Sequence, residues 1–393
     1  MRKLTTALGL PQHRFASIHV VGTNGKSSVT RMTAALLEAH GLRAGACVSP
    51  HADRWSQRTL VEGEEVDEAA WARAVEQVAR AAEGVDRTLE DSEAVTQFEV
   101  ATAASFLALA SARVEAAVIE AGLGGRLDAT NTIPSKVTVL TSIGLDHTEW
   151  LGESEVEIAA EKLAVLRDQT TLVLGAVSPP VAELAARIAG ERGARLVRPP
   201  ADPGPEVHLR ALGEFQRRNF AIACAAAEAF LGDLDCEKAV EVAGSITVPG
   251  RLERIAEGPP TFLDAAHNPA GAEALARSLL AMGDLPVVAC LAVLADKDAA
   301  AMIDALAPAL DFVVCTELPA AALEGHGRPG ARSRPASELA EICEGRSLPS
   351  ATEPDLGAAL RLARSIAKGK LHGSVLVAGS HYAIAPARAV VAA

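Results

Sequence analysis

The chain has 393 residues, of which 49% are hydrophobic, 22% charged and only 3% aromatic, so it can form two domains with aliphatic cores. Its net charge is −13 and it has no run of Lys or Arg, which argues against a nucleic-acid-binding surface. The sequence shows no secretory signal and no uninterrupted apolar stretch of membrane-spanning length, so we expect a soluble cytoplasmic protein.

The cysteines are scattered and form no CxxC pair, which argues against both a disulfide framework and a zinc site. We expect buried free thiols in a reducing compartment at Cys47, Cys224, Cys236, Cys290, Cys315 and Cys343.

The first predicted unit is a strand at 18–21, a glycine turn and a helix that begins at Lys26. Glycines let backbone N–H groups approach phosphate oxygens, and the first turn of a helix carries partial positive charge. Lys26 adds a point charge, and a serine hydroxyl can reach a magnesium ion. Val20 stands where the usual P-loop has its first glycine. We therefore predict a variant P-loop that binds ATP through Gly22, Thr23, Asn24, Gly25, Lys26, Ser27 and Ser28.

Strands and helices alternate from there to about residue 199. We expect strands at 43–48, 114–121 and 137–142, helices at 67–83 and 96–112, a long polar loop at 50–66 and an unstructured join at 84–93. This alternation predicts an α/β fold with a doubly wound, mostly parallel sheet that binds ligands at the carboxyl ends of its strands.

After helices at 215–231 and 236–244 the alternation restarts. We expect strands at 261–264, 286–293, 312–316 and 374–378, and helices at 269–282, 297–306 and 354–367. The sequence thus predicts a P-loop domain at residues 1–247 and a smaller Rossmann-like α/β domain at 248–393.

A metal site is predicted where three strands of the first domain end. Ser49, Glu120 and His147 each end or follow a predicted strand, so they can meet at the edge that carries the P-loop. Taken singly, each also has a structural explanation: a turn residue, a strand-end charge and a core histidine. Together, two oxygen ligands and one imidazole suit magnesium or manganese that bridges phosphates.

Lys162 lies beside Ile158, Leu163 and Leu166, the buried seam of a predicted helix. Lysines on helices are usually solvated, but a lysine that faces a metal–phosphate site can pair with phosphate. It can also be carboxylated by CO2 and then hold metal.

Two strand-to-helix or loop-to-helix junctions carry residues of interest. Thr96 and Glu99 form a predicted capping box, next to which Phe98 is free to stack on a planar ligand. In the second domain, Asn268 is a predicted helix cap, whereas we see no local structural role for Asp264 and His267. A histidine at such a junction can orient a phosphate.

Taken together, these motifs closely resemble those of the folylpolyglutamate synthase/dihydrofolate synthase family of the Mur ligase superfamily. The resemblance extends over essentially the whole chain and rests on motifs in a fixed order: G-T-N-G-K, S-P-H with R-x3-R, F-E, E-A-G-L-G-G-R-L-D-A-T-N, L-D-H-T-E-W-L-G, E-K, P-G-R-L-E and D-A-A-H-N-P. The glycine-rich block is the most specific of these.

The resemblance implies an ATP-dependent ligase that phosphorylates a folate carboxylate and lets the amino group of L-glutamate attack the acyl phosphate. It implies one or two Mg²⁺ ions at Ser49, Glu120 and His147, and a carboxylated Lys162 that acts with Lys26 and His267. It implies ATP contacts from Asn219, Arg251 and Asp264. It places folate or dihydropteroate near the 50–66 loop and His51, Thr96, Gln97, Phe98, Glu99, Leu145 and Asp146. We expect a monomer with no nucleic-acid or membrane partner.

Three departures from the family pattern stand out. Ser27 replaces the glycine of the usual G-K-G-S, so the sequence leaves open whether Ser27 or Ser28 serves the phosphates. E-K-L-A-V replaces the usual E-K-A-G-I. Family members also carry a further segment ahead of the P-loop that helps to wall the pterin site, and this sequence starts after it.

Three other functions remain open from the sequence. A cell-wall Mur ligase usually has a domain ahead of its P-loop for a UDP-sugar. A Mur-ligase-like paralogue would join an amino acid to a non-folate carboxylic acid. A non-ligating P-loop protein would bind ATP alone. The sequence also leaves open whether one or both folate reactions occur, and how many glutamates are added.

Overall fold

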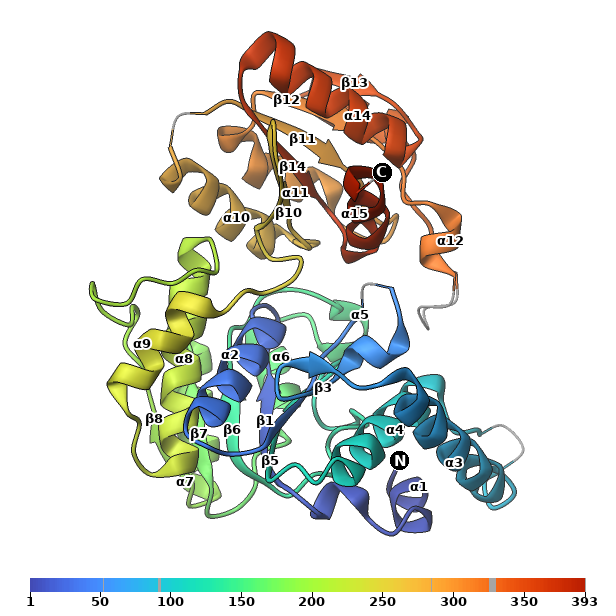
Figure 1. Cartoon of the computed structure of the whole chain (residues 1–393), viewed down its shortest axis with the longest axis vertical. Coiled ribbons are helices and arrows are strands. Elements are labelled where there is room, and N and C mark those ends of the chain that lie inside the picture. The colour runs from blue at the N-terminus through green and yellow to red at the C-terminus, as the bar shows by residue number, and fades with distance from the viewer. Residues whose placement is uncertain (52, 91–92, 284, 325–329, 393) are drawn as a thin grey trace. The chain divides into compact units, whose positions relative to one another are not determined.

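The computed structural model describes residues 1–51, 53–90, 93–283, 285–324 and 330–392 (Figure 1). The chain divides into two compact units. The first comprises Met1–Arg210 and Arg217–Ile246, and the second comprises Ala211–Gln216 and Thr247–Ala393. The short segment at 211–216 therefore belongs to the second unit, whereas the predicted division after residue 247 assigned it to the first.

The first unit is built on an eight-stranded sheet in the order β4-β3-β2-β5-β1-β6-β7-β8. Its strands are β1 (Ala16–Val21), β2 (Ala44–Cys47), β3 (Thr59–Val61), β4 (Glu64–Glu65), β5 (Ala116–Glu120), β6 (Ser135–Leu140), β7 (Thr171–Leu174) and β8 (Arg195–Val197). All neighbours pair in parallel except β2–β3 and β3–β4.

Helices cover both faces of this sheet. They are α1 (Arg2–Ala7), α2 (Lys26–Ala39), α3 (Glu68–Asp86), α4 (Gln97–Ser111), α5 (Thr148–Leu151), α6 (Glu155–Leu163), α7 (Pro179–Glu191), α8 (Glu214–Leu231) and α9 (Cys236–Ser245). The crossover through α2 and the crossover through α4 run in opposite directions along the sheet, so right-handedness places these helices on opposite faces. The β5 side chains Ala117 and Ile119 pack with α4, and Ala121 packs with α6 and α7, so these three helices share one face.

The segment 50–66 is not the loop that the sequence suggested. It contains a 3-10 helix at Trp55–Arg58 and the β3–β4 hairpin, of which β3 pairs antiparallel with β2. The turn between the strands holds Glu62 and Gly63 at φ 52° and 75°, the left-handed geometry that tight hairpins need. Helix α3 also continues to Asp86, into the expected join at 84–93, and residues 52 and 91–92 lie outside the described part.

The second unit has a six-stranded sheet in the order β13-β12-β11-β14-β10-β9, parallel except for β9. Its strands are β9 (Glu253–Glu257), β10 (Pro260–Leu263), β11 (Val287–Leu291), β12 (Phe312–Cys315), β13 (Ser350–Thr352) and β14 (Ser374–Ala378). Its helices are α10 (Pro269–Ala281), α11 (Ala299–Leu306), α12 (Ala320–Leu323), α13 (Ala336–Glu344), α14 (Leu356–Ile366) and α15 (Ile384–Ala392). Two mostly parallel sheets in one chain confirm the predicted fold class.

All six cysteines are free. Cys47, Cys290, Cys315 and Cys343 are buried as expected, but Cys236 is exposed and Cys224 is half-buried, so that expectation was wrong for these two. Within the described residues, no helix is both long and apolar enough to span a bilayer.

Candidate functional site

The turn between β1 and α2 requires its glycines. Gly22 has φ 151°, and a Cβ there would lie 2.0 Å from Oγ1 of Thr141. Gly25 caps α2 at φ 84°, and a Cβ there would lie 2.6 Å from Oδ1 of Asn219 on α8. The turn therefore brings Asn219 against the P-loop within the first unit, which sequence spacing could not show.

Hydrogen bonds fasten the turn to the end of β6. The Thr23 N–H donates to the Ser142 carbonyl at 2.8 Å, and the Asn24 N–H donates to Oγ of Ser142 at 3.1 Å. The Lys26 ammonium folds back onto the carbonyl oxygens of Gly22 and Thr23, at 3.1 and 3.0 Å. A rigid turn followed by a helix N-terminus is the geometry that polyphosphate needs.

A buried carboxylate lies beside this turn. Glu120, at the end of β5, is 3% exposed. Its Oε1 accepts a hydrogen bond from Oγ of Ser27 at 2.9 Å, and its Oε2 accepts one from the Ser49 N–H at 3.0 Å. The Ser27 hydroxyl also lies 3.2 Å from the Ser49 carbonyl. The structure thus gathers the P-loop and the ends of β2 and β5 around one carboxylate.

Ser27 and Ser28 differ clearly. The Ser27 hydroxyl reaches Glu120, whereas Oγ of Ser28 is buried and has no hydrogen-bond partner within the described residues. The replacement of the usual glycine by Ser27 therefore adds an oxygen next to Glu120. A set of carboxylate, hydroxyl and carbonyl oxygens suits a hard divalent cation.

The third residue of the expected metal site, His147, follows β6. His147 has the left-handed φ of 52° and is the N-cap residue of α5. Its N–H donates to Oδ1 of Asp146 at 3.0 Å, and its ring nitrogen Nε2 lies 3.8 Å from the same oxygen. Within the described residues, no three His, Cys, Asp or Glu side chains form a metal-holding group. The structure joins Ser49 to Glu120, and the ligation of one cation by all three residues stays a prediction.

Lys162 is almost completely buried in α6, at 5% exposure. Burial and, to a smaller extent, the charge of Lys26 lower the pKa of its ammonium to about 7, while Asp146, Asp128 and Glu161 oppose the shift. The lysine is therefore close enough to the P-loop lysine to feel its charge, and a large fraction of it is uncharged at neutral pH.

An aromatic and cationic cluster forms where Phe98 was expected to stack on a ligand. A Cβ at Gly122 would lie 2.4 Å from Cζ of Phe98, so this ring occupies the space that the glycine leaves. Arg58 lies over Trp55 at 4.4 Å and over Phe98 at 5.8 Å, measured to the ring centroids. Its Nε donates to Nδ1 of His51 at 2.9 Å. Sequence reasoning named His51 and Phe98 individually, but it included Arg58 only in the R-x3-R motif and Trp55 only in the 50–66 segment.

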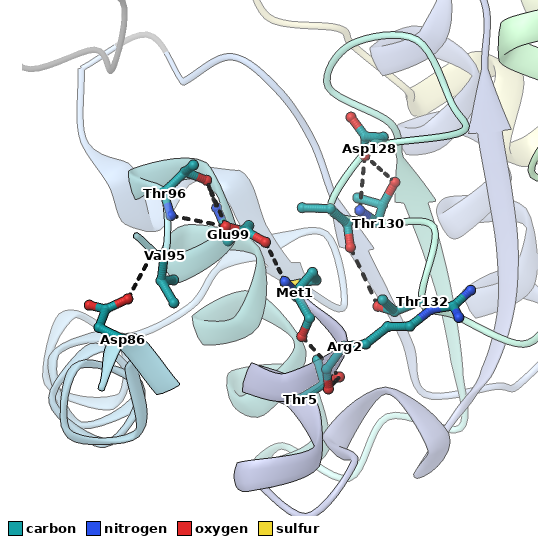
Figure 2. Close-up of polar contacts among 11 residues, drawn as sticks. Met1, Arg2, Thr5, Asp86, Val95, Thr96, Glu99, Asp128, Thr130 and Thr132 are labelled. Atoms are coloured by element: carbon teal, nitrogen blue, oxygen red, sulfur yellow. Dashed lines mark hydrogen bonds and ion pairs between the residues drawn. The ribbon is translucent and has the colours of Figure 1, made fainter. Parts of the chain in front are cut away.

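Other residues of the expected acid pocket have structural duties. The predicted capping box is present: Thr96 and Glu99 exchange hydrogen bonds of 2.9 and 3.2 Å at the start of α4 (Figure 2). The second oxygen of Glu99 pairs with the backbone nitrogen of Met1. Gln97 opens the helix, and Leu145 is 58% exposed. Contacts of these residues with an acid remain predictions.

In the second unit, Asp264 has the local role that the sequence reasoning denied it. It is 4% exposed, and its two oxygens accept hydrogen bonds from the N–H groups of Leu252 and Ala266, at 2.8 and 2.7 Å. Burial raises the pKa of this carboxyl group, while the charge of Arg251 and these hydrogen bonds oppose the rise.

The histidine and the cap follow at the same junction. Nδ1 of His267 lies 2.9 Å from the Ala265 carbonyl. Asn268 caps α10 as predicted, because its Oδ1 accepts from the Gly271 N–H at 2.8 Å.

Comparison with known proteins decides the family. Residues 20–198 match the Mur ligase middle domain, and residues 250–381 match the Mur ligase, glutamate ligase domain. The dihydrofolate synthase/folylpolyglutamate synthase of Mycobacterium tuberculosis is 37% identical over 352 residues, which are 80% of this chain and 72% of that protein. The chain belongs to the folylpolyglutamate synthase/dihydrofolate synthase family.

Solved structures of similar proteins support the same family. A Mycobacterium tuberculosis folylpolyglutamate synthase complexed with ADP superimposes with a TM-score of 0.91 at 33% identity, covering 100% of this chain and 94% of that one. A bifunctional folylpolyglutamate synthase/dihydrofolate synthase with Mn, AMPPNP and L-glutamate bound gives a TM-score of 0.83 at 27% identity, covering 100% and 93%. This family member is therefore an ATP-dependent ligase that joins a folate carboxylate to L-glutamate, as the sequence motifs predicted.

Proposed function

We propose that this ligase accepts both dihydropteroate and reduced folates, and that the acid is phosphorylated beside Glu120 in the first unit. The observation that carries the proposal is the Glu120 carboxylate, which is held by Ser27 and Ser49 directly next to the P-loop turn. The bifunctional names of the similar proteins support the two acids. A carboxylate is a poor electrophile, and its conversion to an acyl phosphate supplies a leaving group.

A divalent cation fits the donors on this edge. We assign Mg²⁺, as one or two ions, to Ser49, Glu120 and His147, because their oxygens and imidazole suit a hard cation. A related structure holds manganese. The bound cation would supply positive charge that offsets the charge on the phosphoryl oxygens.

Lys162 has the properties of a lysine that reacts with CO2. Carboxylation needs the uncharged amine, and burial together with Lys26 lowers the pKa of Lys162 to about 7. The nitrogen lone pair forms an N–C bond with CO2, one proton leaves to solvent, and the product is a carbamate anion. The neighbouring Lys26 ammonium stabilises that anion.

The remaining roles are proposed from the sequence motifs together with the geometry within each unit. Lys26 lies across the P-loop turn, so it is placed to bind the phosphates of ATP. The acid lies near Phe98 and His51, and the cluster of Arg58, Trp55 and Phe98 forms one wall of its pocket. We assign ATP contacts to Asn219, Arg251 and Asp264, and phosphate orientation to His267. The amino group of glutamate then attacks the acyl carbonyl and phosphate leaves.

The direct test is a ligation assay with the purified chain, ATP, Mg²⁺, L-glutamate and either dihydropteroate or tetrahydrofolate. We expect ADP release and a product one glutamyl residue heavier with each acid. Product from only one acid contradicts the proposed dual activity. If neither acid leads to ADP release, the substrate is a non-folate acid.

The carbamate has its own test. Protein kept under ¹³C-labelled bicarbonate should show a carbamate carbon resonance that is missing in Lys162→Ala. An identical spectrum for both proteins contradicts carboxylation. We also propose that the enzyme acts in the cytoplasm, which its six free thiols support. We further propose that it is a monomer, so the purified chain should sediment at the mass of one copy.

A further inference from the structure

A buried hydrogen-bond chain lies behind the glycine-rich loop at 122–126. His19, in the central strand β1, is fully buried, and its Nε2 lies 2.8 Å from Oγ1 of Thr130. The Thr130 hydroxyl lies 2.5 Å from Oδ1 of Asp128, which also accepts from the Thr130 N–H at 2.9 Å (Figure 2). Oδ2 of Asp128 accepts from the Leu123 N–H at 2.8 Å, so the chain ends on the loop itself.

The hydrogen bonds of this chain converge on Asp128, because donors on both sides point toward its carboxylate. A carboxylate only accepts, so the Thr130 hydroxyl donates to Asp128, and Nε2 of His19 then donates to the Thr130 oxygen. Burial, helped by the charge of Arg167, lowers the pKa of His19 to about 3, which keeps the ring neutral. The other ring nitrogen, Nδ1, has no hydrogen-bond partner within the described residues, as fits a nitrogen that carries no proton.

The loop held by this chain connects two parts of the site. At one end, Gly122 packs directly under the Phe98 ring. At the other end, a Cβ at Gly125 would lie 2.6 Å from the Lys162 carbonyl, and the Arg126 N–H donates to the Glu161 carbonyl at 3.1 Å. Asp128 itself is close enough to raise the pKa of Lys162 against the lowering effect of burial.

We propose that His19 is a positioning residue that acts through Thr130 to hold Asp128, and with it the glycine-rich loop, between Phe98 and Lys162. In this proposal His19 does not contact ATP, the acid or glutamate. The functional part of the proposal depends on the placement of the acid beside Phe98, whereas the effect on the loop does not.

The kinetic test compares two threonines. Thr130→Val removes the central hydroxyl and should raise KM for the acid about 10-fold, because a hydrogen bond to a charged group is lost, with KM for ATP unchanged. The matched control is Thr138→Val. Thr138, on β6, pairs with His19 of the neighbouring strand β1. Its buried hydroxyl has no hydrogen-bond partner within the described residues, so this change should leave both KM values as they are.

Histidine variants separate positioning from packing. His19→Phe keeps a ring but loses the N–H, and it should match the rise in KM of Thr130→Val. His19→Gln restores a donor near Nε2 and should recover most of the affinity. The double variant His19→Phe/Thr130→Val should be no worse than either single change, because the two residues act in series. Additive effects, or a His19→Phe enzyme with normal KM, overturn the proposal.

Hydrogen exchange of the full ligand-free chain tests the loop without any assay of activity. Thr130→Val and His19→Phe should speed amide exchange in the peptide covering 122–130, while exchange in α7 stays unchanged and Thr138→Val has no effect. If exchange becomes faster in the variants but the wild-type enzyme ligates neither folate acid, the role of His19 in holding the loop is supported and the proposed function is contradicted. Unchanged exchange in this peptide refutes the anchor itself.

Discussion

Burial of Lys162 has a cost in stability, and the chemistry proposed for this residue depends on the same burial. Its pKa falls from an ordinary value of 10.5 to about 7 because it is buried. Between these pH values the unfolded chain binds more protons at this residue than the folded chain does, so its contribution makes stability rise with pH. The cost of burying the ammonium is complete below about pH 7 and fades toward pH 10.

Lys162→Met should stabilise the fold at low pH and, if Lys162 has the proposed role, abolish ligation. We expect the variant to exceed the wild type in free energy of unfolding by roughly 2–4 kcal/mol at pH 6, with a smaller gap at pH 9. Urea unfolding at both pH values measures the gap. A difference that does not change with pH contradicts the burial argument, and near-normal turnover contradicts the catalytic role.

A second prediction for a single residue concerns the negative charge of Glu120. Glu120→Gln keeps the size of the side chain but removes the anion beside the P-loop, so the magnesium concentration for half-maximal activity should rise at least 10-fold. Ser27→Gly, which removes only the hydroxyl that contacts Glu120, serves as the control and should shift this midpoint less. A magnesium titration unchanged in Glu120→Gln would falsify the proposed metal site.

At the scale of the elements, the glycine-rich loop at 122–126 leaves little room for larger side chains. In Gly122→Ala the new methyl group meets the Phe98 ring at 2.4 Å, so the ring or the loop must move. We expect KM for the acid to rise at least 5-fold, with α4 still folded because its capping box is untouched.

The control for this loop is Gly84→Ala in α3. A Cβ at Gly84 meets nothing within 4 Å, and alanine favours the helix by roughly 0.5–1 kcal/mol. Activity should be unchanged and thermal stability slightly higher. Equal kinetics in Gly122→Ala and wild type would mean that Phe98 does not depend on the loop.

For the whole molecule, the unusual feature is the segment Ala211–Gln216, which belongs to the second unit although the chain returns to the first unit after it. Leu212 and Phe215 pack against the core of the second unit, and the Glu214 N–H donates to Oγ of Ser278 on α10 at 3.1 Å. The first turn of α8 thus stabilises a unit whose main part begins at residue 247.

Phe215→Ala should destabilise the second unit selectively, by roughly 1–3 kcal/mol, because part of its core loses an aromatic ring. Hydrogen exchange should quicken in α10 and stay the same in α2. Phe230→Ala changes the same residue type at the other end of α8, where Phe230 contacts Lys136 of the first unit, and should not affect α10. Equal effects of both changes on α10 contradict the assignment of the segment.

The sequence alone determined what depends on neighbouring residues or on regular spacing. The glycine turn with Lys26, the capping box of Thr96 and Glu99, and the cap Asn268 are local, and each appears in the structure where the pattern placed it. The alternation of strands and helices predicted two mostly parallel sheets, because buried parallel strands are apolar throughout and their crossovers need helices. The order of motifs predicted the family.

Only the tertiary structure decided the contacts between residues far apart in the chain. The tertiary structure alone decided the pairing of β3 with β2, the contact of Arg58 with Phe98, the bond from the Leu252 N–H to Asp264 and the link from His19 to Asp128. Such contacts depend on which side chains meet when sheets and helices pack. Spacing along one strand or helix carries no information about that meeting.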